Sequence, residues 1–443
     1  MKQWGMEFMC TLLRTRPSRL VARAASLLAI VGVALLSGGT AQADTAKEGS
    51  NHWLATWSAS PQAATPSNLA FIPGDVSAIG FTNQTVRNVV FTSVGGSALR
   101  VRLTNTFGSQ PVTFNEVDVG LVQSGATLVS GSSQIVTFAG KTTVRIAPGA
   151  EALSDPVQMS VRPLASLAVS LFSGGSTGPA TYHFNANQTN YIAPGNAASN
   201  ASGAAFTTTS AAWYFVDDVD VLVRPQTRDT IVALGDSITD GFGSTPNANH
   251  RWPNLLAQRI LGGPPGLVDS VVDEGISGNR VLNNSLCFGV DAQSRLDRDV
   301  LAQAGGQFVI LLEGINDIGF SQLPNTGCSS PNTDVSANEI IAGYHQIIAQ
   351  VHAQGLKIFG GTLTPFQGAF YFSVAGEAKR EAVNAFVRTS GAFDGVIDFD
   401  KAVRDPSNPL RFLPAYDSGD HLHPNDAGYQ AMANAVDLAL FRP

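Results

Sequence analysis

From Thr230 onward, short apolar segments alternate with longer segments of helical periodicity, and this alternation constrains the fold more than any other feature of the chain. The apolar segments are centred near residues Ile231, Val271, Val309, Ile358 and Ile397. The helical segments span residues 252–261, 291–304, 335–353, 377–389 and 426–440. Strands that alternate with helices in this way form a parallel sheet covered by helices. We therefore expect an α/β domain built on five parallel strands.

The N-terminal half has a different pattern. Between residues 51 and 223, segments such as Leu99-Arg100-Val101-Arg102-Leu103-Thr104 alternate apolar and polar side chains and are separated by Gly, Ser, Asn and Pro. Such segments are strands with one buried face, and many of them in succession predict an antiparallel sandwich or jelly-roll domain. We expect an accessory β-domain over residues 44–225 and the α/β domain over residues 226–443. The short connection around Pro225 predicts that the two pack against each other.

The first 43 residues have the pattern of a secretory signal peptide. Four arginines between residues 14 and 23 lead into an apolar run over residues 24–36, and Ala41-Gln42-Ala43 supplies small residues for cleavage after Ala43. The apolar run is short for a membrane span, although a retained anchor is the alternative. No later segment is apolar for long enough to cross a bilayer. We therefore expect a secreted or periplasmic protein.

The charge balance argues against nucleic acid as a partner. The full chain has 27 basic and 34 acidic residues, and removing the signal segment, with its five basic and one acidic residue, leaves 22 and 33, a formal charge of −11. No basic run remains that could neutralise phosphates.

Two cysteines remain after that removal, Cys287 and Cys328. An even pair in an exported chain predicts a disulfide, and two thiols without a neighbouring histidine do not suggest a zinc site.

Polar motifs follow three of the expected strands, and a fourth lies near the C-terminus. They are Gly235-Asp236-Ser237, Ser277-Gly278-Asn279, Gly314-Ile315-Asn316-Asp317 and Asp420-His421-Leu422-His423-Pro424. The carboxyl ends of parallel strands meet at one edge of the sheet, where ligands bind. One site can therefore gather all four motifs.

The residue types in these motifs are those of a nucleophilic serine site. Ser237 can attack a carbonyl carbon, His423 can accept its proton near neutral pH, and Asp420 can hold the imidazole in the required tautomer. The backbone N–H groups of Ser237 and Gly278, with the side-chain amide of Asn316, can surround a developing oxyanion.

This four-motif pattern resembles the SGNH (GDSL) hydrolase superfamily over residues 229–443. The resemblance implies a three-layer α/β/α domain that acts on esters with no metal or organic cofactor. Three shorter segments resemble exported bacterial members that carry an N-terminal β-domain and are described as carbohydrate-esterase-like. They are Trp53-Leu54-Ala55-Thr56-Trp57, Leu363-Thr364-Pro365-Phe366 and Pro414-Ala415-Tyr416-Asp417-Ser418-Gly419.

We therefore expect a secreted serine esterase that removes short acyl groups, such as acetyl, from small-molecule or oligosaccharide esters. Within enzymes, the alternatives are a lipase or arylesterase of wider acyl tolerance, and an acyltransferase. A carbohydrate-binding protein in which the β-domain is the functional part is the alternative outside enzymes. The sequence leaves the oligomeric state open.

Several residues near the motifs are interpreted as structural. Asp236 is expected to cap neighbouring N–H groups, Asp317 to orient backbone beside Asn316, and His421 to point away from His423 in an extended loop.

Arg280 could bind a substrate carboxylate, but an ion pair with Asp273 or Glu274 is the more common arrangement. Three tryptophans of the β-domain could form a sugar-stacking platform, although aromatic residues of a sandwich more often belong to its core. They are Trp53, Trp57 and Trp213.

Overall fold

The computed structural model describes residues 50–70, 72–263, 266 and 268–442. The expected signal peptide over residues 1–43, with its cleavage after Ala43, lies outside them. Within the described part of the chain, no helix is long and apolar enough to cross a membrane. From residue 50 onward the chain packs as one compact unit, and a division into domains at residues 225 and 226 stays a prediction. We call residues 50–223 the β-region and residues 230–442 the α/β region.

The α/β region is built on a five-stranded parallel sheet with the strand order β17-β16-β18-β19-β20. In chain order the strands are β16 (Thr230–Gly235), β17 (Ser270–Gly275), β18 (Gly306–Leu312), β19 (Lys357–Gly361) and β20 (Gly395–Ile397). All five contain the apolar segments predicted from the sequence. The strand order reverses at β16, because β17 lies on one side of it and β18 on the other. Open α/β sheets bind ligands at such a point.

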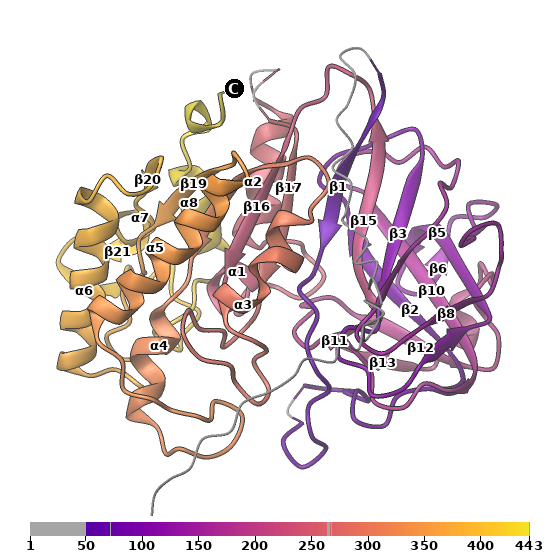
Figure 1. The fold of residues 1–443 in the computed structure, drawn as a ribbon, viewed down its shortest axis with the longest axis horizontal. Coiled ribbons are helices and arrows are strands. Elements are labelled where there is room, and N and C mark those ends of the chain that lie inside the picture. The colour runs from indigo at the N-terminus through magenta and orange to yellow at the C-terminus, as the bar shows by residue number, and fades with distance from the viewer. Residues whose placement is uncertain (1–49, 71, 264–265, 267, 443) are drawn as a thin grey trace, which may run out of the picture. The chain divides into compact units, whose positions relative to one another are not determined.

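Helices cover both faces of this sheet, so the expected three-layer arrangement is confirmed (Figure 1). One face carries α2 (Trp252–Leu261), α7 (Phe399–Val403) and α8 (Asp426–Ala435). The other face carries α3 (Ala292–Leu296), α5 (Ala337–Ala353) and α6 (Val374–Thr389). Short helices follow two of the strands, α1 (Ser237–Asp240) after β16 and α4 (Ile315–Gly319) after β18.

Two expected helices differ from the structure at their C-terminal ends. The helix predicted over residues 291–304 is α3 followed by a π-helical turn, η2 (Asp297–Leu301). The helix predicted over residues 426–440 ends at Ala435, and a separate 3₁₀ turn, η4 (Leu438–Phe441), follows. Short elements complete the region: η3 (Phe320–Gln322), β21 (Arg404–Asp405) and β22 (Asn408–Phe412).

The β-region is antiparallel throughout, as the sequence predicts. One sheet has the order β1-β15-β3-β9, formed by β1 (His52–Ser58), β15 (Val216–Val223), β3 (Leu99–Thr104) and β9 (Glu151–Leu153). The second has the order β13-β12-β2-β10-β5-β6, formed by β13 (Thr208–Ser210), β12 (Asn190–Pro194), β2 (Thr82–Phe91), β10 (Ser166–Ser176), β5 (Glu116–Ser124) and β6 (Thr127–Leu128), with β7 (Gln134–Ile135) beside β5. Smaller pairs are β11 (Tyr182–His183) with β14 (Trp213–Tyr214) and β4 (Val112–Phe114) with β8 (Val144–Ile146), and η1 (Gly203–Ala205) is a single turn.

Apolar side chains from both large sheets share one buried cluster, which makes the β-region a sandwich. Val101 of β3 and Val86 of β2 both belong to it. Trp57 and Trp213 lie in the same cluster with ring centroids 5.0 Å apart, and both are buried. These two rings are therefore core residues and not an exposed platform.

The β-region packs on the edge of the parallel sheet, where β1 lies beside β17 (Figure 1). The N–H of Ala55 donates to the carbonyl of Ala304 over 2.9 Å. The hydroxyls of Ser93 and Ser270 lie 2.9 Å apart. Nearer the carboxyl end of β17, the Ser60 hydroxyl donates to the carboxylate of Glu274 over 2.5 Å. The β-region thus follows β17 along its length.

Candidate active site

Ser237 begins α1 directly after strand β16, in a turn that leaves little room for side chains. A Cβ atom on Gly235 would lie 2.5 Å from the carbonyl oxygen of Leu312, so only glycine fits there. Asp236 caps α1, because its carboxylate accepts the N–H of Ile238 over 3.0 Å. The turn fixes the Ser237 side chain at the carboxyl edge of the sheet.

His423 and Asp420 come from the loop that precedes α8, and the structure brings both to Ser237. Nε2 of His423 lies 2.8 Å from Oγ of Ser237, and Nδ1 lies 2.6 Å from a carboxylate oxygen of Asp420. The other Asp420 oxygen accepts the N–H groups of Leu422 and His423, each over 2.9 Å. Burial alone would raise the pKa of Asp420, but these hydrogen bonds, the strongest with His423, hold it well below its usual range. The carboxylate stays ionised and can stabilise an imidazolium.

Three hydrogen-bond donors line the space in front of Ser237. The N–H groups of Ser237 and Gly278 make no hydrogen bond to another described residue. Nδ2 of Asn316 donates to the carbonyl of Asn279 over 3.0 Å, and its Oδ1 accepts the Tyr371 hydroxyl over 3.2 Å. These two bonds fix the amide plane and leave the second amide proton of Asn316 for a ligand. Three donors grouped in this way can stabilise an oxyanion.

Gly278 needs its glycine for two reasons. Its φ is +80°, a conformation that side chains disfavour, and an added Cβ would lie 2.4 Å from the ring of Phe288. Phe288 in turn follows Cys287, which forms a disulfide with Cys328 as predicted. The carbonyl of Cys287 accepts Nε2 of Gln62 from the β-region over 3.0 Å. The disulfide loop therefore connects the β-region to the ring that packs on Gly278.

The pocket in front of Ser237 is a cavity of about 160 Å³ with walls that are almost wholly apolar. Its lining residues are Phe184, Ser237, Phe242, Ser277, Gly278, Phe288, Asn316, Phe320, Phe370, Tyr371, Leu422 and His423. Many of the rings contact one another; the centroids of Phe288 and Phe320, for example, lie 5.8 Å apart. Phe184 comes from the β-region, directly after β11, so both parts of the chain build the pocket.

These aromatic residues were not predicted from the sequence. They come from separate loops, and the sequence offers no spacing that distinguishes them from core residues among the 24 phenylalanines. Two of them, Phe242 and Phe370, are 42% and 69% exposed and lie at the mouth of the pocket. In the structure they differ from core residues by this exposure.

Two acidic residues of the motifs, Asp317 and Asp236, accept hydrogen bonds from backbone N–H groups. Asp317 accepts the N–H groups of Val281 and Leu282 over 2.8 and 3.1 Å, so it ties the third motif to the segment after the second. Burial raises the pKa of Asp317 to about 7 in spite of these bonds. Burial likewise raises the pKa of Asp236 to about 7, although Asp236 accepts the N–H of Ile238.

The expected ion pair of Arg280 with Asp273 or Glu274 is wrong. The guanidinium donates to the carbonyls of Pro331 and Asn284 over 2.6 and 2.7 Å, and it faces the disulfide loop. Closeness in sequence misled the prediction, because Arg280 lies beyond the end of β17 and points away from that strand's acidic residues. His421 pairs with the carboxylate of Asp417 over 2.6 Å on the exposed side of its loop.

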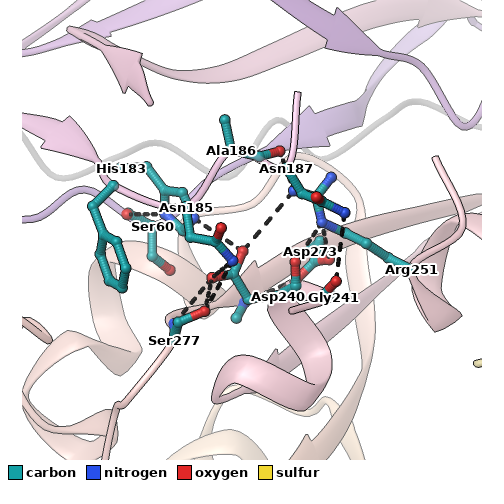
Figure 2. A network of polar contacts seen from close by, with 12 residues as sticks. Ser60, His183, Asn185, Ala186, Asn187, Asp240, Gly241, Arg251, Asp273 and Ser277 are labelled. Atoms are coloured by element: carbon teal, nitrogen blue, oxygen red, sulfur yellow. Dashed lines mark hydrogen bonds and ion pairs between the residues drawn. The ribbon is translucent and has the colours of Figure 1, made fainter. Parts of the chain in front are cut away.

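A buried polar network, shown in Figure 2, lies beside the second motif and also escaped the sequence analysis. At its centre is Asp240, the last residue of α1, whose carboxylate contacts Ser277 and two residues of the β-region, His183 and Asn185. Arg251 and Asp273 lie at its edge. The members of this network are far apart in sequence, and no motif joins them.

The comparisons with known proteins agree with this geometry. A family model, the GDSL-like Lipase/Acylhydrolase family, matches residues 233–431. A comparison with curated proteins finds no match.

Several solved structures are similar to part of this chain. An acetylxylan esterase from Geobacillus stearothermophilus is 21% identical over 47% of this chain and 92% of that chain, with a TM-score of 0.35. An inhibitor-bound aryl esterase of M. smegmatis is 18% identical over 46% and 94%, with a TM-score of 0.35. A GDSL-like lipase from Bacteroides thetaiotaomicron is 18% identical over 48% and 87%, with a TM-score of 0.35. Similarities at this level carry no part of the assignment.

The family assignment rests on the family model. The matched residues include all four motifs, from Ser237 to His423. In the structure, strand ends and loops of this segment bring those motifs to one pocket. Residues 233–431 therefore form a GDSL-like lipase/acylhydrolase domain of the SGNH hydrolase superfamily, and the protein is a carboxylic ester hydrolase.

Proposed function

We propose that Ser237, His423 and Asp420 carry out ester hydrolysis through an acyl-enzyme. The observation that carries this proposal is the continuous series of hydrogen bonds from Ser237 Oγ through the imidazole of His423 to the carboxylate of Asp420. This series supplies a nucleophile, a general base and a group that fixes the tautomer of the base.

The reaction follows from these contacts. Ser237 Oγ bonds to the ester carbonyl carbon while its proton passes to Nε2 of His423. The oxyanion that forms lies against the N–H groups of Ser237 and Gly278 and the amide of Asn316. When the tetrahedral centre collapses, the alcohol leaves with the proton held by His423. A water molecule then attacks the acyl-serine by the same route, and the acid is released as Ser237 regains its proton.

The pocket favours an apolar group on one side of the ester bond. A cavity of similar size, roughly 150 Å³ and lined by apolar residues, binds benzene in another protein, and this pocket of about 160 Å³ has the same character. A sugar placed there would leave its hydroxyls without partners, which costs free energy. We therefore propose that the pocket binds an acyl or aryl group of roughly four to eight carbons, within the alternative of an arylesterase or lipase of wide acyl tolerance.

The expected preference for acetyl groups on carbohydrates stays a prediction. An acetyl group would fill a small part of the cavity, and the sugar would lie outside the pocket, near the exposed rings of Phe242 and Phe370. Transfer of the acyl group to another alcohol requires only that an alcohol replace water in the second step. We also propose export of the protein, which the disulfide between Cys287 and Cys328 supports.

The test is a series of nitrophenyl esters from two to sixteen acyl carbons, together with acetylated xylo-oligosaccharides. We expect kcat/KM to be highest between about four and eight carbons and to fall for longer chains that exceed the pocket. Ser237→Ala gives the uncatalysed background. A maximum at the acetyl ester with efficient release of acetate from the oligosaccharides would restore the carbohydrate preference. Product formation with an added alcohol measures the share of acyl transfer.

A further inference from the structure

Two residues of the β-region reach the segment that carries the oxyanion-hole glycine. His183 ends strand β11, and Asn185 follows two positions later; both contact the carboxylate of Asp240 (Figure 2). Asp240 ends the short helix that begins at Ser237. The β-region therefore touches the turn of the nucleophile and the second motif through one carboxylate.

Asp240 fixes the position of Ser277, the residue before Gly278. One carboxylate oxygen, Oδ2, accepts the N–H of Ser277 over 3.0 Å and its hydroxyl over 2.5 Å. The same oxygen accepts Nδ2 of Asn185 over 3.2 Å, and Asn185 also donates to the Ser277 hydroxyl over 3.0 Å. Asp240, Ser277 and Asn185 are all buried. These bonds fix Ser277 through its N–H and its side chain, and the peptide that carries the Gly278 N–H follows directly from this residue.

The other oxygen of Asp240 faces His183. Nε2 of His183 lies 3.1 Å from Oδ1 of Asp240, and Nδ1 lies 2.9 Å from the carbonyl oxygen of Ser60. Both partners accept hydrogen bonds, so both ring nitrogens donate and the ring is an imidazolium.

The charges around His183 agree with this protonation state. Burial lowers the pKa of His183, but the charge and the hydrogen bond of Asp240 outweigh burial, and the pKa is raised. The other charged groups that face this pair are Arg251, whose Nη2 lies 4.0 Å from Oδ1 of Asp240, and Asp273, which lies 3.8 Å from Nε of Arg251. The imidazolium and Arg251 therefore both offset the buried charge of Asp240, and of the two His183 lies closer.

We propose that His183 is a positioning residue for ester hydrolysis, which acts through Asp240 and Ser277 to hold the Gly278 N–H toward the oxyanion. The inference rests on the proposed role of Gly278 in the oxyanion hole. It gives the β-region a part in the chemical step, in addition to the wall that Phe184 contributes to the pocket.

The expected size of the effect follows from geometry. A displacement of about 1 Å at a catalytic group can reduce the rate by about a hundredfold. A donor that acts only on the oxyanion stabilises the transition state and not the bound ester, so its displacement lowers kcat and leaves KM nearly unchanged.

The experiment compares four variants with the wild type in the full chain. His183→Ala removes the donor to Asp240, and His183→Gln keeps a neutral amide that can donate in its place. Asn185→Ala removes a different donor to the same carboxylate. Ser93→Ala is the matched control, because it removes a hydrogen bond between the β-region and Ser270 at the other end of β17, away from the pocket. Each protein is measured for kcat and KM on nitrophenyl butyrate, for inhibition by phenylboronic acid and for melting temperature.

We expect His183→Ala to lower kcat by ten- to a hundredfold with KM within about twofold, and to weaken binding of the boronate, which forms a tetrahedral adduct, by a similar factor. His183→Gln should recover most of this loss, and Ser93→Ala should match the wild type. Should His183→Ala fail to fold, Asn185→Ala carries the test, with a several-fold fall in kcat and a parallel loss of boronate affinity.

The proposal is overturned if a folded His183→Ala, or in its absence Asn185→Ala, keeps kcat within twofold of the wild type. It is also overturned if only KM changes, or if His183→Gln recovers the melting temperature without recovering kcat. Failure of the proposed function would look different, since the wild type itself would then hydrolyse no ester or would keep its activity in Ser237→Ala.

Discussion

Substitution of Gly278 by alanine should damage catalysis much more than folding. At this position φ is +80°, and the left-handed conformation costs a residue with a Cβ about 1–2 kcal/mol. The new Cβ would also lie 2.4 to 2.7 Å from three ring atoms of Phe288, closer than real Cβ contacts come. The segment must shift to relieve this contact, and the N–H of residue 278 shifts with it.

The expected loss of kcat follows from the role proposed for the Gly278 N–H. Loss of one oxyanion donor typically reduces kcat by a hundred- to a thousandfold, equivalent to about 2.7–4 kcal/mol of transition-state stabilisation. We expect Gly278→Ala to lower kcat in this range on nitrophenyl butyrate with a small change in KM. We expect it to lower the free energy of unfolding, measured with urea, by about 1–3 kcal/mol.

Gly289 supplies the matched control. Its φ is +74°, so alanine meets the same backbone strain, but the nearest atoms to an added Cβ lie 3.3 and 3.4 Å away, in the side chains of Ile276 and Gln62. Gly289→Ala should therefore lose a similar amount of stability through strain and keep most of its kcat. If both variants lose kcat equally, or if Gly278→Ala keeps wild-type kcat, the assignment of the Gly278 N–H to the oxyanion hole is refuted.

Four further predictions concern the nucleophile, the base, a buried acid and the β-region. Ser237→Ala should abolish turnover, and an organophosphonate should label the wild type at Ser237 alone, as peptide mass spectrometry can show. Activity should fall on acidification because a protonated His423 cannot accept the serine proton, while Asp420 stays ionised because its pKa lies well below the usual range. A flat pH–rate profile would contradict a histidine base. Asp420→Asn should lose up to about 10⁴-fold in kcat, yet its kcat should stay above that of His423→Ala. Burial raises the pKa of Asp236 to about 7, so the folded state keeps a proton that the unfolded chain releases above about pH 4. The free energy of unfolding should therefore decrease as pH rises from about 4 to 7, by at most about 1.4 kcal/mol per pH unit. In urea titrations, the free energy of unfolding of Asp236→Asn should depend less on pH. The fragment 226–443 should aggregate or lose its acyl selectivity, because it exposes the sheet edge at β17 that the β-region covers and lacks Phe184. A soluble fragment with unchanged selectivity would show that the β-region is dispensable.

The sequence predicted the elements whose signals are local. Helix α2 matches the predicted residues 252–261, and the strand predicted at residues 99–104 matches β3, because each has a clear apolar period and well-defined ends. The four motifs were predicted to meet because parallel strands place their carboxyl ends at one edge. The helix predicted over residues 426–440 ends early at Ala435, since the apolar residues beyond it pack as a separate turn.

The sequence could not predict contacts that depend on packing between distant segments. The Arg280 side chain turned to carbonyls of the disulfide loop and not to acids a few residues away, because the direction of a side chain past the end of a strand is set by the loops around it. His183 meets Asp240 across 57 residues, and neither has a neighbour that suggests a partner. The rings of the pocket come from separate loops and could not be distinguished from core phenylalanines.

The order of residues at the end of β11 has a consequence for engineering this enzyme. Phe184 forms part of the pocket wall, and the residues on either side of it, His183 and Asn185, contact Asp240. On the roles proposed above, three consecutive positions of the β-region control both the choice of acyl group and the alignment of the oxyanion hole. A graft that replaces this strand end to change specificity would alter the turnover rate at the same time, whereas libraries that vary Phe184 and keep its two neighbours should separate the two properties.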